Sequence, residues 1–425
     1  MSSLLFKNAR IIYPVGSIGS AGDILVRDGI IAEMGSGITD SAAQTIDASG
    51  LVAAPGFLDM HTHLRDPGFT DKEDIISGCE AAAAGGVTAL AAMPNTSPVA
   101  DSPDTIKYIL DKAKNASARV LPVASVTKGM EGSELTDFSE LVKVGAIAFS
   151  EDGKSVANSK LMLEALKLSA WHNVPILAHC EDAFLAQGGI MNEGTVSEML
   201  GVNGIPSAAE EAGTARDLAI LLSAGSGAKL HICHVSTGSS IELIRAVKNL
   251  GVRVTAETCP HYFSFTDELL VQQDADYRMN PPLRSESDRK SVIRGLIDGT
   301  IDVIATDHAP HTAAEKSDFL SAPNGTTGLE TSFAAAYTYL VKGGYISLFK
   351  LIYLMSAAPA KILCTGGGSL RVGSPANIAL IDLEEKWRPS PEKMYGKSHN
   401  SVFKGVQLTS KVKYTVYNGN PVFKD

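Results

Sequence analysis

The sequence predicts an α/β protein, a (β/α)₈ TIM-type barrel with a small β-sandwich formed by the N- and C-terminal flanks. Three observations support this fold class. Between about residues 50 and 365, short and nearly continuous apolar runs alternate with helical segments, as in a parallel sheet covered by helices. Eight such runs are present, which fits a closed barrel better than an open doubly wound sheet. Both flanks contain short β-like pieces with Gly and Asp turns.

Each predicted barrel strand is followed by a predicted helix. The strands cover residues 52–63, 87–95, 119–126, 146–153, 174–182, 229–236, 252–262 and 302–311. The helices cover residues 72–84, 103–115, 134–144, 158–172, 207–224, 238–250 and 286–298, and a last one starts near Glu330. A Rossmann sheet is the alternative, but no GxGxxG motif opens a helix. The glycine run 366–368 lies past the barrel and is interpreted as a plain turn.

Both flanks consist of short segments that resemble β-strands. Pieces 5–12, 23–34 and 44–50 precede the barrel, and 376–385 and 411–423 follow it. The start of the chain lacks a secretory arrangement. The first piece is instead interpreted as an edge strand, because its Leu-Phe and Ile-Ile pairs flank polar residues. Neither flank alone holds enough apolar surface for a stable core, so we expect them to pack together. The predicted domains are 1–52 and 365–425 for the sandwich and 53–364 for the barrel.

The composition limits the kinds of partner. Of 425 residues, 37 are Lys or Arg and 47 are Asp or Glu, which gives a net charge of −10. This charge argues against nucleic acid or an anionic membrane, and no apolar run of about 18 residues is present. We therefore expect a small-molecule substrate. The five cysteines are scattered, odd in number and mostly within apolar segments, which indicates buried free thiols and a cytoplasmic location. None has CxxC spacing, which argues against a cysteine zinc cluster. They are Cys79, Cys180, Cys233, Cys259 and Cys364.

The octet HTHLRDPG, residues 61–68, follows directly on the apolar run LVAAPGFLDM and so starts at the end of the first predicted strand. Side chains two apart on a strand point the same way, so His61 and His63 project together from its end. Two imidazoles so placed can bind one metal ion. The guanidinium of Arg65 can hold a carboxylate by two hydrogen bonds. The alternatives are a metal-free histidine pair, and a surface ion pair of Arg65 with Asp66 or Asp71.

The other strand ends carry further ligand-type side chains. The carboxyl ends of barrel strands form one face, so these groups should converge there. They are Asn95, Glu151, Asp152, His179, His234, His261, Asp307, His308 and His311, and the third strand ends without an ionisable group. Of the ten histidines, only His172, His231 and His399 lie elsewhere. Imidazoles and carboxylates in such numbers can hold two ions about 3.5–4 Å apart with a bridging water.

The motifs HTHLRDPG, AMPNT, FSEDG, AHCED, CHVST, ETCPHY, MNPPLR, ATDHAPHT and TGLET resemble, in this order, the series of the amidohydrolase superfamily. The resemblance is closest to the class I dihydroorotase family and covers the whole barrel and, more weakly, the flanks. It implies reversible cyclisation of N-carbamoyl-L-aspartate to (S)-dihydroorotate in de novo pyrimidine biosynthesis. It also implies two Zn²⁺ ions per subunit.

The resemblance implies metal ligands at matching positions. His61, His63 and Asp307 look like ligands of the first ion. His179 and His234 look like ligands of the second. Asp152 looks like the carboxylate that bridges both ions beside a hydroxide, since the family's bridging carboxylate stands directly before the glycine of FSEDG. The neighbouring Glu151 is the competing candidate for this bridge.

The resemblance also implies substrate contacts. Arg65, Asn95 and His311 resemble the groups that grip the substrate carboxylate. Asn280 and the backbone at Thr327 and Gly328 resemble contacts to the amide edges of the ring. For Asn95 and Asn280 the alternative is turn capping.

The chemistry of ring opening agrees with these roles. It requires a nucleophile, a polarised carbonyl and a proton for the departing nitrogen. Two metals acidify a bridging water and stabilise the charge of the tetrahedral intermediate. Asp307 can take the water's proton and pass it to the leaving nitrogen, while Arg65 positions the carboxylate.

The same barrel pattern also fits two alternative functions. Hydantoinases, dihydropyrimidinases and allantoinases usually bridge their metals with a carbamylated lysine at the end of strand four. Here Lys143 precedes that strand and Lys154 follows its glycine, which favours the dihydroorotase family. The second alternative is a non-catalytic, dihydroorotase-like scaffold that binds aspartate transcarbamoylase. Such copies typically lose metal ligands, whereas this sequence keeps them all.

Other features stay open at this level. A homodimer and an association with aspartate transcarbamoylase are both compatible with the sequence. His261 and His308 either fix the tautomer of a neighbouring ligand or are satisfied core or turn histidines. Segment 312–326 is either a mobile lid over the site or an ordinary surface loop.

Overall fold

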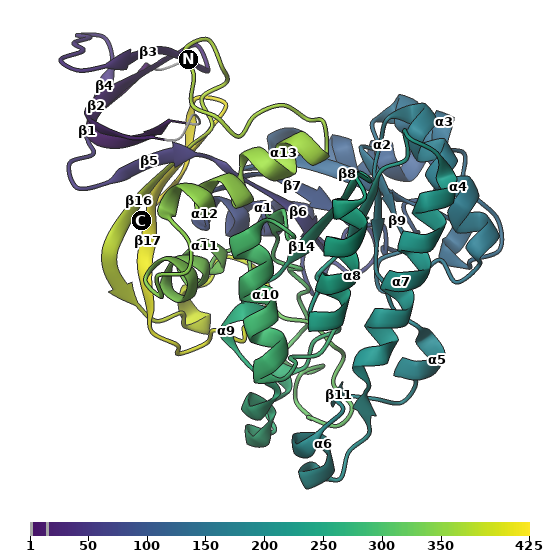
Figure 1. Cartoon of the computed structure of the whole chain (residues 1–425). Helices are drawn as coiled ribbons and strands as arrows, with labels where there is room; N and C mark the ends of the chain where they lie inside the picture. Colours follow the sequence, from purple (N-terminus) through teal and green to yellow (C-terminus); the bar gives the residue numbers. More distant parts are fainter. Residues whose placement is uncertain (1–2, 14–16) are drawn as a thin grey trace.

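The structure is a computed structural model that describes residues 3–13 and 17–425, with only the backbone described at 13 and 17–20. It contains a helix-covered barrel and a second sheet made from the two ends of the chain (Figure 1). The prediction of a (β/α)₈ barrel is confirmed. Among the described residues, no helix combines the length and apolar character needed to cross a membrane.

The barrel sheet consists of eight parallel strands in the order β15-β14-β13-β10-β9-β8-β7-β6. The first four along the chain are β6 (Phe57–Thr62), β7 (Val87–Ala92), β8 (Arg119–Ser125) and β9 (Ala148–Ser150). The others are β10 (Ile176–Ala178), β13 (Leu230–Ile232), β14 (Val254–Thr258) and β15 (Val303–Ile304). A parallel bridge between Thr62 and His308 joins the first strand end to the last, and the His63 N–H donates to the His308 carbonyl at 2.8 Å. The ring therefore closes at the residues predicted to bind metal.

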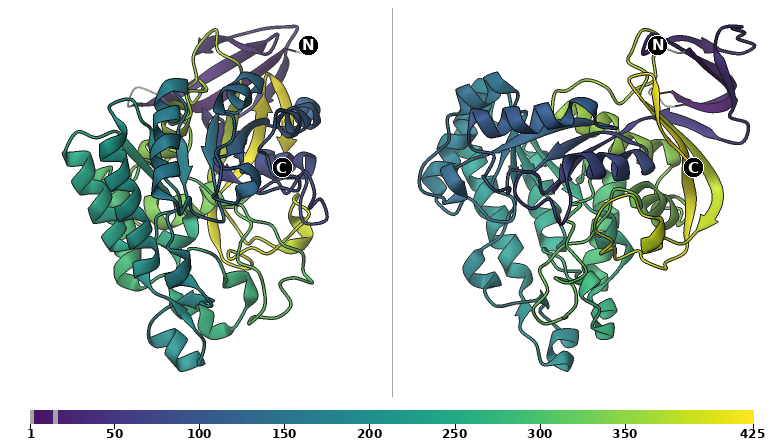
Figure 2. Two further views of the ribbon diagram at one scale, coloured as in Figure 1. Left: turned by 90° about the vertical axis from the view of Figure 1, so that its right-hand side faces the viewer. Right: turned by 180° about the vertical axis from the view of Figure 1, so that it is seen from behind.

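Helices cover the outside of the barrel at the predicted positions (Figures 1 and 2). They are α1 (Ile75–Ala84), α2 (Pro103–Lys112), α3 (Phe138–Val144), α4 (Ser159–His172), α7 (Ser207–Ala224), α8 (Gly238–Asn249), α10 (Glu286–Asp298) and α11 (Ser332–Ala336). Six of them begin after a polar side chain that accepts a backbone N–H from the first turn, as N-caps do. These caps are Asp74, Ser102, Asp137, Asn158, Thr237 and Ser285.

Several short elements have too few residues to show a periodicity, and the sequence did not predict them. The helices are α5 (Ala183–Ala186), α6 (Thr195–Leu200), α9 (Pro260–Ser264), α12 (Leu348–Met355) and α13 (Ala357–Ile362), and the strands are β11 (Met191–Asn192) and β12 (Gly204–Ile205). Short 3₁₀ segments are η1 (Ala113–Asn115), η2 (Lys128–Met130), η3 (Asp267–Gln272), η4 (Ala275–Tyr277) and η6 (Pro391–Lys393), and the π-helical η5 (Tyr337–Val341) continues α11. The predicted strand 252–262 is wrong at its end, because Pro260 starts α9 with a φ suited to a first helical position.

The flanks form one continuous sheet, drawn in purple and yellow in Figure 1. Its order is β18-β17-β16-β5-β1-β2-β3, with β4 beside β1. The strands are β1 (Leu4–Tyr13), β2 (Ser17–Arg27), β3 (Ile30–Gly35), β4 (Gln44–Asp47), β5 (Val52–Pro55), β16 (Ile378–Trp387), β17 (Leu408–Tyr417) and β18 (Asn420–Lys424). The two flanks join where β5 pairs with β16, and the sheet has its own small core that includes Phe6, Ile24 and Ile378. The expected packing of the two flanks on each other is confirmed. Their strands are hydrogen-bonded into one sheet, in place of the two facing sheets that a sandwich has.

Two details of the strand prediction are wrong. The piece 5–12 is not an edge strand, because β1 pairs with β2 on one side and with β4 and β5 on the other. The stretch 52–63 is two strands, since β5 belongs to the flanking sheet and β6 to the barrel. An apolar run cannot show that the chain passes from one sheet to another at Gly56. The domain limits 1–52, 53–364 and 365–425 stay a prediction.

Candidate metal centre and active site

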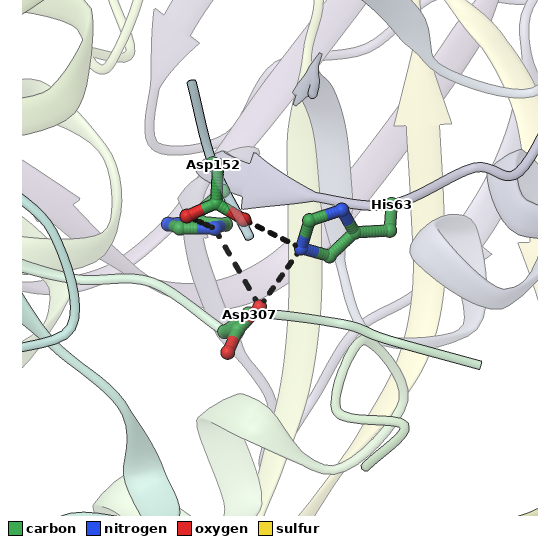
Figure 3. Close-up of side chains that lie close together, drawn as sticks. His63, Asp152 and Asp307 are labelled. Atoms are coloured by element: carbon green, nitrogen blue, oxygen red, sulfur yellow. Dashed lines mark hydrogen bonds and ion pairs between the residues drawn. The ribbon is translucent and has the colours of Figure 1, made fainter. Parts of the chain in front are cut away.

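The six predicted metal ligands lie together at the carboxyl ends of the barrel strands. His61 is the second-last residue of β6, and His63 follows directly after that strand. Asp152, His179, His234 and Asp307 follow β9, β10, β13 and β15. All six side chains are buried. Figure 3 shows His63, Asp152 and Asp307 pointing toward one another. Residues separated by up to 246 positions therefore form one cluster because each ends a neighbouring strand.

The first group of ligand atoms surrounds one point between four side chains. His61 Nε2 lies 3.3 Å from Asp152 Oδ1 and 3.5 Å from Asp307 Oδ1. His63 Nε2 lies 3.2 Å from Asp152 Oδ2 and 3.1 Å from Asp307 Oδ1. One ligand atom of each of these four residues lies within 4.8 Å of the others. Two imidazoles and two carboxylates at this spacing can hold one divalent cation.

A second group shares Asp152 with the first. Asp152, His179 and His234 also offer ligand atoms within 4.8 Å of one another. The Asp152 Oδ1 lies 3.3 Å from His234 Nε2 and 3.6 Å from His179 Nδ1. The neighbouring Glu151 is turned away, because it accepts the Thr127 N–H at 2.8 Å, and burial raises its pKa to about 7. The geometry therefore favours Asp152 over Glu151 as the shared carboxylate.

The electrostatics of the cluster fit cations. Burial by itself raises the pKa of Asp152, but the facing His61, His179 and His234 hold that pKa well below its usual range. The pKa of Asp307 is likewise lowered, against burial, by His61 and His63. The Nε2 atoms of His61 and His179 are buried and have no hydrogen-bond partner in the described part of the chain. Since buried polar atoms are normally paired, ionised carboxylates beside such nitrogens fit a metal-binding role.

Three of the predicted site residues hold an unusual backbone conformation. Arg65, His234 and Asp307 have φ values of 60°, 36° and 48°. Non-glycine residues rarely adopt this left-handed region, and such outliers concentrate at active sites. The backbone is held there because each residue sits where a strand ends and the chain turns across the face of the barrel.

Sequence reasoning missed the side chains that hold His61 from behind. Glu257 Oε1 lies 2.6 Å from His61 Nδ1, and Glu257 Oε2 lies 3.1 Å from His231 Nε2. Asp59 Oδ1 accepts the backbone N–H groups of His61 and Thr306, each at 3.1 Å. A carboxylate behind a ligating imidazole fixes its tautomer and orientation. The available signal was the two-residue spacing of Asp59 before His61, which places both on one side of the strand.

Neither of the two histidines left open by the sequence makes a side-chain hydrogen bond to a metal ligand among the described residues. His308 Nδ1 accepts the Gly328 N–H at 3.2 Å. His261 packs against the Tyr262 ring at 4.2 Å between centroids, and burial lowers the pKa of His261 to about 3. His261 is thus a neutral core side chain, and His308 anchors a loop.

A cavity of about 260 Å³ lies over the metal ligands. It is lined by His63, Arg65, Asn95, Asp152, Gly153, His179, Asn280, Asp307, Ala309, His311, Asn324 and Gly325. The alternative ion pair of Arg65 with Asp66 or Asp71 does not form, and Arg65 Nη2 instead lies 3.4 Å from His311 Nε2. A largely buried guanidinium without a carboxylate partner in the described structure is suited to bind an anion.

The two asparagines predicted to bind substrate also line this cavity. The Oδ1 of Asn95 lies 2.9 Å from His63 Nδ1, so Asn95 orients a predicted ligand. Asn280 donates from Nδ2 to Glu181 Oε2 at 2.8 Å, while its Oδ1 is buried without a partner in the described part of the chain. Neither caps a turn, and the Asn280 oxygen remains available for a donor on a ligand.

The structure does not bring Thr327 and Gly328 to the cavity. Their N–H groups donate to the Asn400 carbonyl at 2.9 Å and to His308 Nδ1 at 3.2 Å. Asn324 and Gly325 line the cavity instead, and the Asn324 Oδ1 is buried with no described partner. Asn400 sets this path, because its Nδ2 donates to the Ala309 and Gly325 carbonyls at 3.2 and 3.0 Å. A contact with a residue so distant in the chain leaves no local signal.

Segment 312–326 is anchored beside the cavity. Lys316 Nζ donates to the carbonyls of Ala275, Arg278 and Pro323 at 3.0, 3.2 and 2.8 Å. Glu315 Oε1 forms an ion pair with Lys72 Nζ at 2.6 Å. Movement of this segment as a lid stays a prediction.

Three comparisons relate the chain to known proteins. Residues 50–240 match a family model described as dihydro-orotase-like. The chain is 47% identical to a dihydroorotase of Acetivibrio thermocellus over 99% of both chains. It is 45% identical to a dihydroorotase of Ruminiclostridium cellulolyticum over 99% of this chain and 98% of the relative. The structure of an L-hydantoinase (dihydropyrimidinase) from Arthrobacter aurescens matches with a TM-score of 0.89 at 25% identity, over 100% of this chain and 96% of that one.

Proposed function

This chain belongs to the dihydroorotase family of the amidohydrolase superfamily, and we propose from that premise how its residues carry out the reaction. It is a hydrolase of cyclic amides that interconverts N-carbamoyl-L-aspartate and (S)-dihydroorotate. The hydantoinase alternative is less specific, because it rests on a shared barrel at 25% identity against 47% for a dihydroorotase.

We propose that the site holds two zinc ions. His61, His63 and Asp307 would hold the first, His179 and His234 the second, and Asp152 both. The two overlapping groups of ligand atoms and the unpartnered Nε2 atoms of His61 and His179 support this assignment. When bound, such cations lower the pKa of a water and polarise a carbonyl oxygen.

Asp307 is proposed to carry the proton. Its pKa is lowered, so it is a carboxylate at neutral pH and can accept a proton from the attacking water. During ring opening a C–O bond forms, the ring C–N bond breaks, and Asp307 passes the accepted proton to the departing nitrogen. In cyclisation the same carboxylate takes the proton from the carbamoyl nitrogen and returns it to the water that leaves.

The cavity wall is proposed to fix the substrate. Arg65 binds its carboxylate together with His311, and Asn95 supports this end by orienting His63. Asn280 and the segment at Asn324 and Gly325 bind the amide edges of the ring, since both asparagines line the cavity and their Oδ1 atoms have no hydrogen-bond partner among the described residues. Positioning of this kind places the reacting carbonyl beside the nucleophile.

The observation that carries the proposal is that Arg65, which has no carboxylate partner among the described residues, lies in the same cavity as Asp152 and Asp307. The test measures cyclisation of N-carbamoyl-L-aspartate by the purified protein alongside its metal content. We expect turnover that is lost on chelation and restored by zinc. A metal-free, inactive protein that binds aspartate transcarbamoylase tightly would instead identify the non-catalytic scaffold.

The ligand assignment has its own prediction. His61→Ala and His179→Ala should each lower the number of zinc ions per chain, measured by elemental analysis, and unequally if the two sites differ in affinity. His172→Ala is the matched control, because this histidine lies on α4 and contacts Ser139 at 3.2 Å. Unchanged stoichiometry in either ligand variant would remove that residue from the ligand set.

The setting of the enzyme is also part of the proposal. A cytoplasmic location is supported by the five free cysteines, of which only Cys364 is exposed. A homodimer, the commonest default for a soluble protein, and an association with aspartate transcarbamoylase both stay predictions.

A further inference from the structure

A second cavity lies at the end of the barrel opposite the metal ligands. Its volume is about 760 Å³, against about 260 Å³ for the cavity over the ligands. Lys229, Arg253 and Asp302 in its wall directly precede β13, β14 and β15, so it lies where these strands begin. Helices α12 and α13 close its side, near the end of the barrel at which the chain enters from β5 (Figure 1). This face of a barrel ordinarily serves stability alone.

The wall of this cavity is rich in cations. Lys229, Arg253, Lys350 and Lys361 line it, against the single acid Asp302. Asp302 is already engaged, because its Oδ2 accepts from Lys248 Nζ at 2.6 Å and from the Ala256 N–H at 2.8 Å. Within the described residues, no acid forms an ion pair with the other cations of the wall. A local excess of unpaired cations in a chain of net charge −10 favours an anionic ligand.

Most of the remaining wall is apolar. It includes Ile301, Leu354, Ala358 and Ile362, together with the ring of Tyr353, which is 39% exposed. Ligand cavities of roughly 300–1,000 Å³ typically combine such a surface with a few placed polar groups. The concave shape and the volume fit a small molecule better than a segment of an acidic protein.

We propose that this cavity binds a phosphorylated small molecule that carries a planar apolar group, as nucleoside phosphates do. Its phosphates would contact Arg253, Lys350 and Lys361, which supply guanidinium and ammonium donors. Its planar group would lie against Tyr353 and Leu354.

A chain of hydrogen-bonded side chains connects this cavity to the metal centre. Thr255 lies in the cavity wall, and its Oγ1 is 2.8 Å from His231 Nδ1. His231 Nε2 lies 3.1 Å from Glu257 Oε2, and Glu257 Oε1 lies 2.6 Å from His61 Nδ1. His231, Glu257 and His61 are each fully buried. On this proposal, a ligand in the cavity shifts His61 through these contacts and so regulates the reaction.

Binding is tested by calorimetry on the metal-loaded protein, with N-carbamoyl-L-aspartate in excess to fill the active site. The probes are adenosine triphosphate, inorganic pyrophosphate and adenosine. We expect the triphosphate to bind most tightly and adenosine at least about tenfold more weakly, because it lacks the charged contacts. The double variant Lys350→Gln/Lys361→Gln should bind the triphosphate at least about tenfold more weakly than the unaltered protein.

The matched control is Lys112→Gln/Lys160→Gln, which removes the same charge from exposed positions on α2 and α4. It should bind like the unaltered protein. An equal loss of triphosphate affinity in both double variants would overturn the proposal, and so would the absence of saturable binding of the triphosphate and of pyrophosphate. Polyglutamate is a further probe, and a protein that binds it but neither phosphate compound would also overturn the proposal. The calorimetric measurement needs no turnover, so its outcome does not depend on whether the protein has dihydroorotase activity.

Location is tested by alkylation of Cys364, whose Sγ lies 3.5 Å from Lys229 Nζ at the rim. It is the exposed cysteine of this chain, and the other four are buried. Saturating triphosphate should slow its alkylation several-fold. Binding that leaves this rate unchanged would place the ligand elsewhere and overturn the site.

The connection to the metal centre is tested with Thr255→Val, which removes the first hydrogen bond and keeps the cations. The triphosphate should change kcat/KM of the unaltered enzyme several-fold, as coupled sites commonly do. In the variant it should still bind but no longer change kcat/KM. An unaltered enzyme whose kcat/KM ignores a bound triphosphate would contradict the regulatory role.

Discussion

At the residue scale, His61 shows how one ligand depends on its surroundings. Glu257 holds its Nδ1 at 2.6 Å, which leaves Nε2 free toward Asp152 and Asp307. The imidazole is therefore oriented before any cation binds. The HxH spacing predicted the two histidines as a pair. It could not reveal Glu257, which lies 196 residues further along the chain.

The role of Asp307 is tested by replacing it with asparagine. Asparagine tolerates the positive φ of 48° at this position, so the fold and much of the metal should be retained. Without a carboxylate to move the proton, we expect turnover to fall by about 10²–10⁴-fold or more. Initial rates, circular dichroism and metal analysis check this outcome. Near-normal turnover would refute the proton-carrying role.

The role of Arg65 is tested by the change to lysine. Lysine keeps the charge but loses the two-pronged contact, so the KM for dihydroorotate should rise by about 10–100-fold. Dihydrouracil, which has the ring without the carboxylate, provides the comparison and should be affected much less. If the KM values of both compounds rise alike, Arg65 does not bind the carboxylate.

At the element scale, strand ends were predictable and connections were not. Apolar runs that stop at polar residues marked all eight barrel strands, although β9, β10, β13 and β15 are only two or three residues long. The helix α9 and the strands β11 and β12 were missed because so few residues carry no period. The sequence pointed to Thr327 and Gly328, whereas Asn324 and Gly325 line the cavity, because Asn400 from the C-terminal flank holds the Gly325 carbonyl.

One connection carries a pH-dependent prediction. Glu330, just before α11, accepts the Tyr395 N–H at 2.9 Å and the Gly396 N–H at 3.3 Å, and burial raises its pKa to about 7. A raised pKa means that the protonated form is favoured in the folded chain. The stability that protonated Glu330 contributes to the folded chain is thus complete below pH 4.5 and is lost as the pH rises through about 7.

Glu330→Gln removes this titration and keeps an oxygen that can accept the same N–H groups. Between pH 5 and pH 8 the variant should gain on the order of 2–3 kcal/mol in free energy of unfolding relative to the unaltered protein. Urea unfolding at both pH values measures this difference. If the free energies of unfolding of the variant and the unaltered protein differ by the same amount at pH 5 and at pH 8, Glu330 is not the titrating group.

At the scale of the whole molecule, the metal centre lies where the barrel closes. Its proposed ligands come from β6, β9, β10, β13 and β15, and the Thr62–His308 bridge joins the first and last of these strands. Bound cations would therefore connect strands that are far apart in sequence. Removing them leaves the ionised Asp152 and Asp307 buried beside each other.

We therefore expect chelation to lower the thermal stability of the protein. A ligand at a thousand times its Kd stabilises the folded state by about 4 kcal/mol, so the Tm should fall by several degrees and recover with zinc. Differential scanning calorimetry measures this change. His179→Ala should respond less to the chelator, and a Tm that chelation leaves unchanged would contradict structural coupling of the site.

By itself the sequence determined the barrel, the order of its strands along the chain and the chemical types at their ends. These follow from local alternation and spacing, which a chain displays without folding. Only the tertiary structure decided that the flanks share one sheet, that Glu257 and His231 stand behind His61, and that Asn324 and Gly325 line the cavity. Such pairings depend on which distant segments pack together, and that is set by the whole core and by no single stretch of sequence.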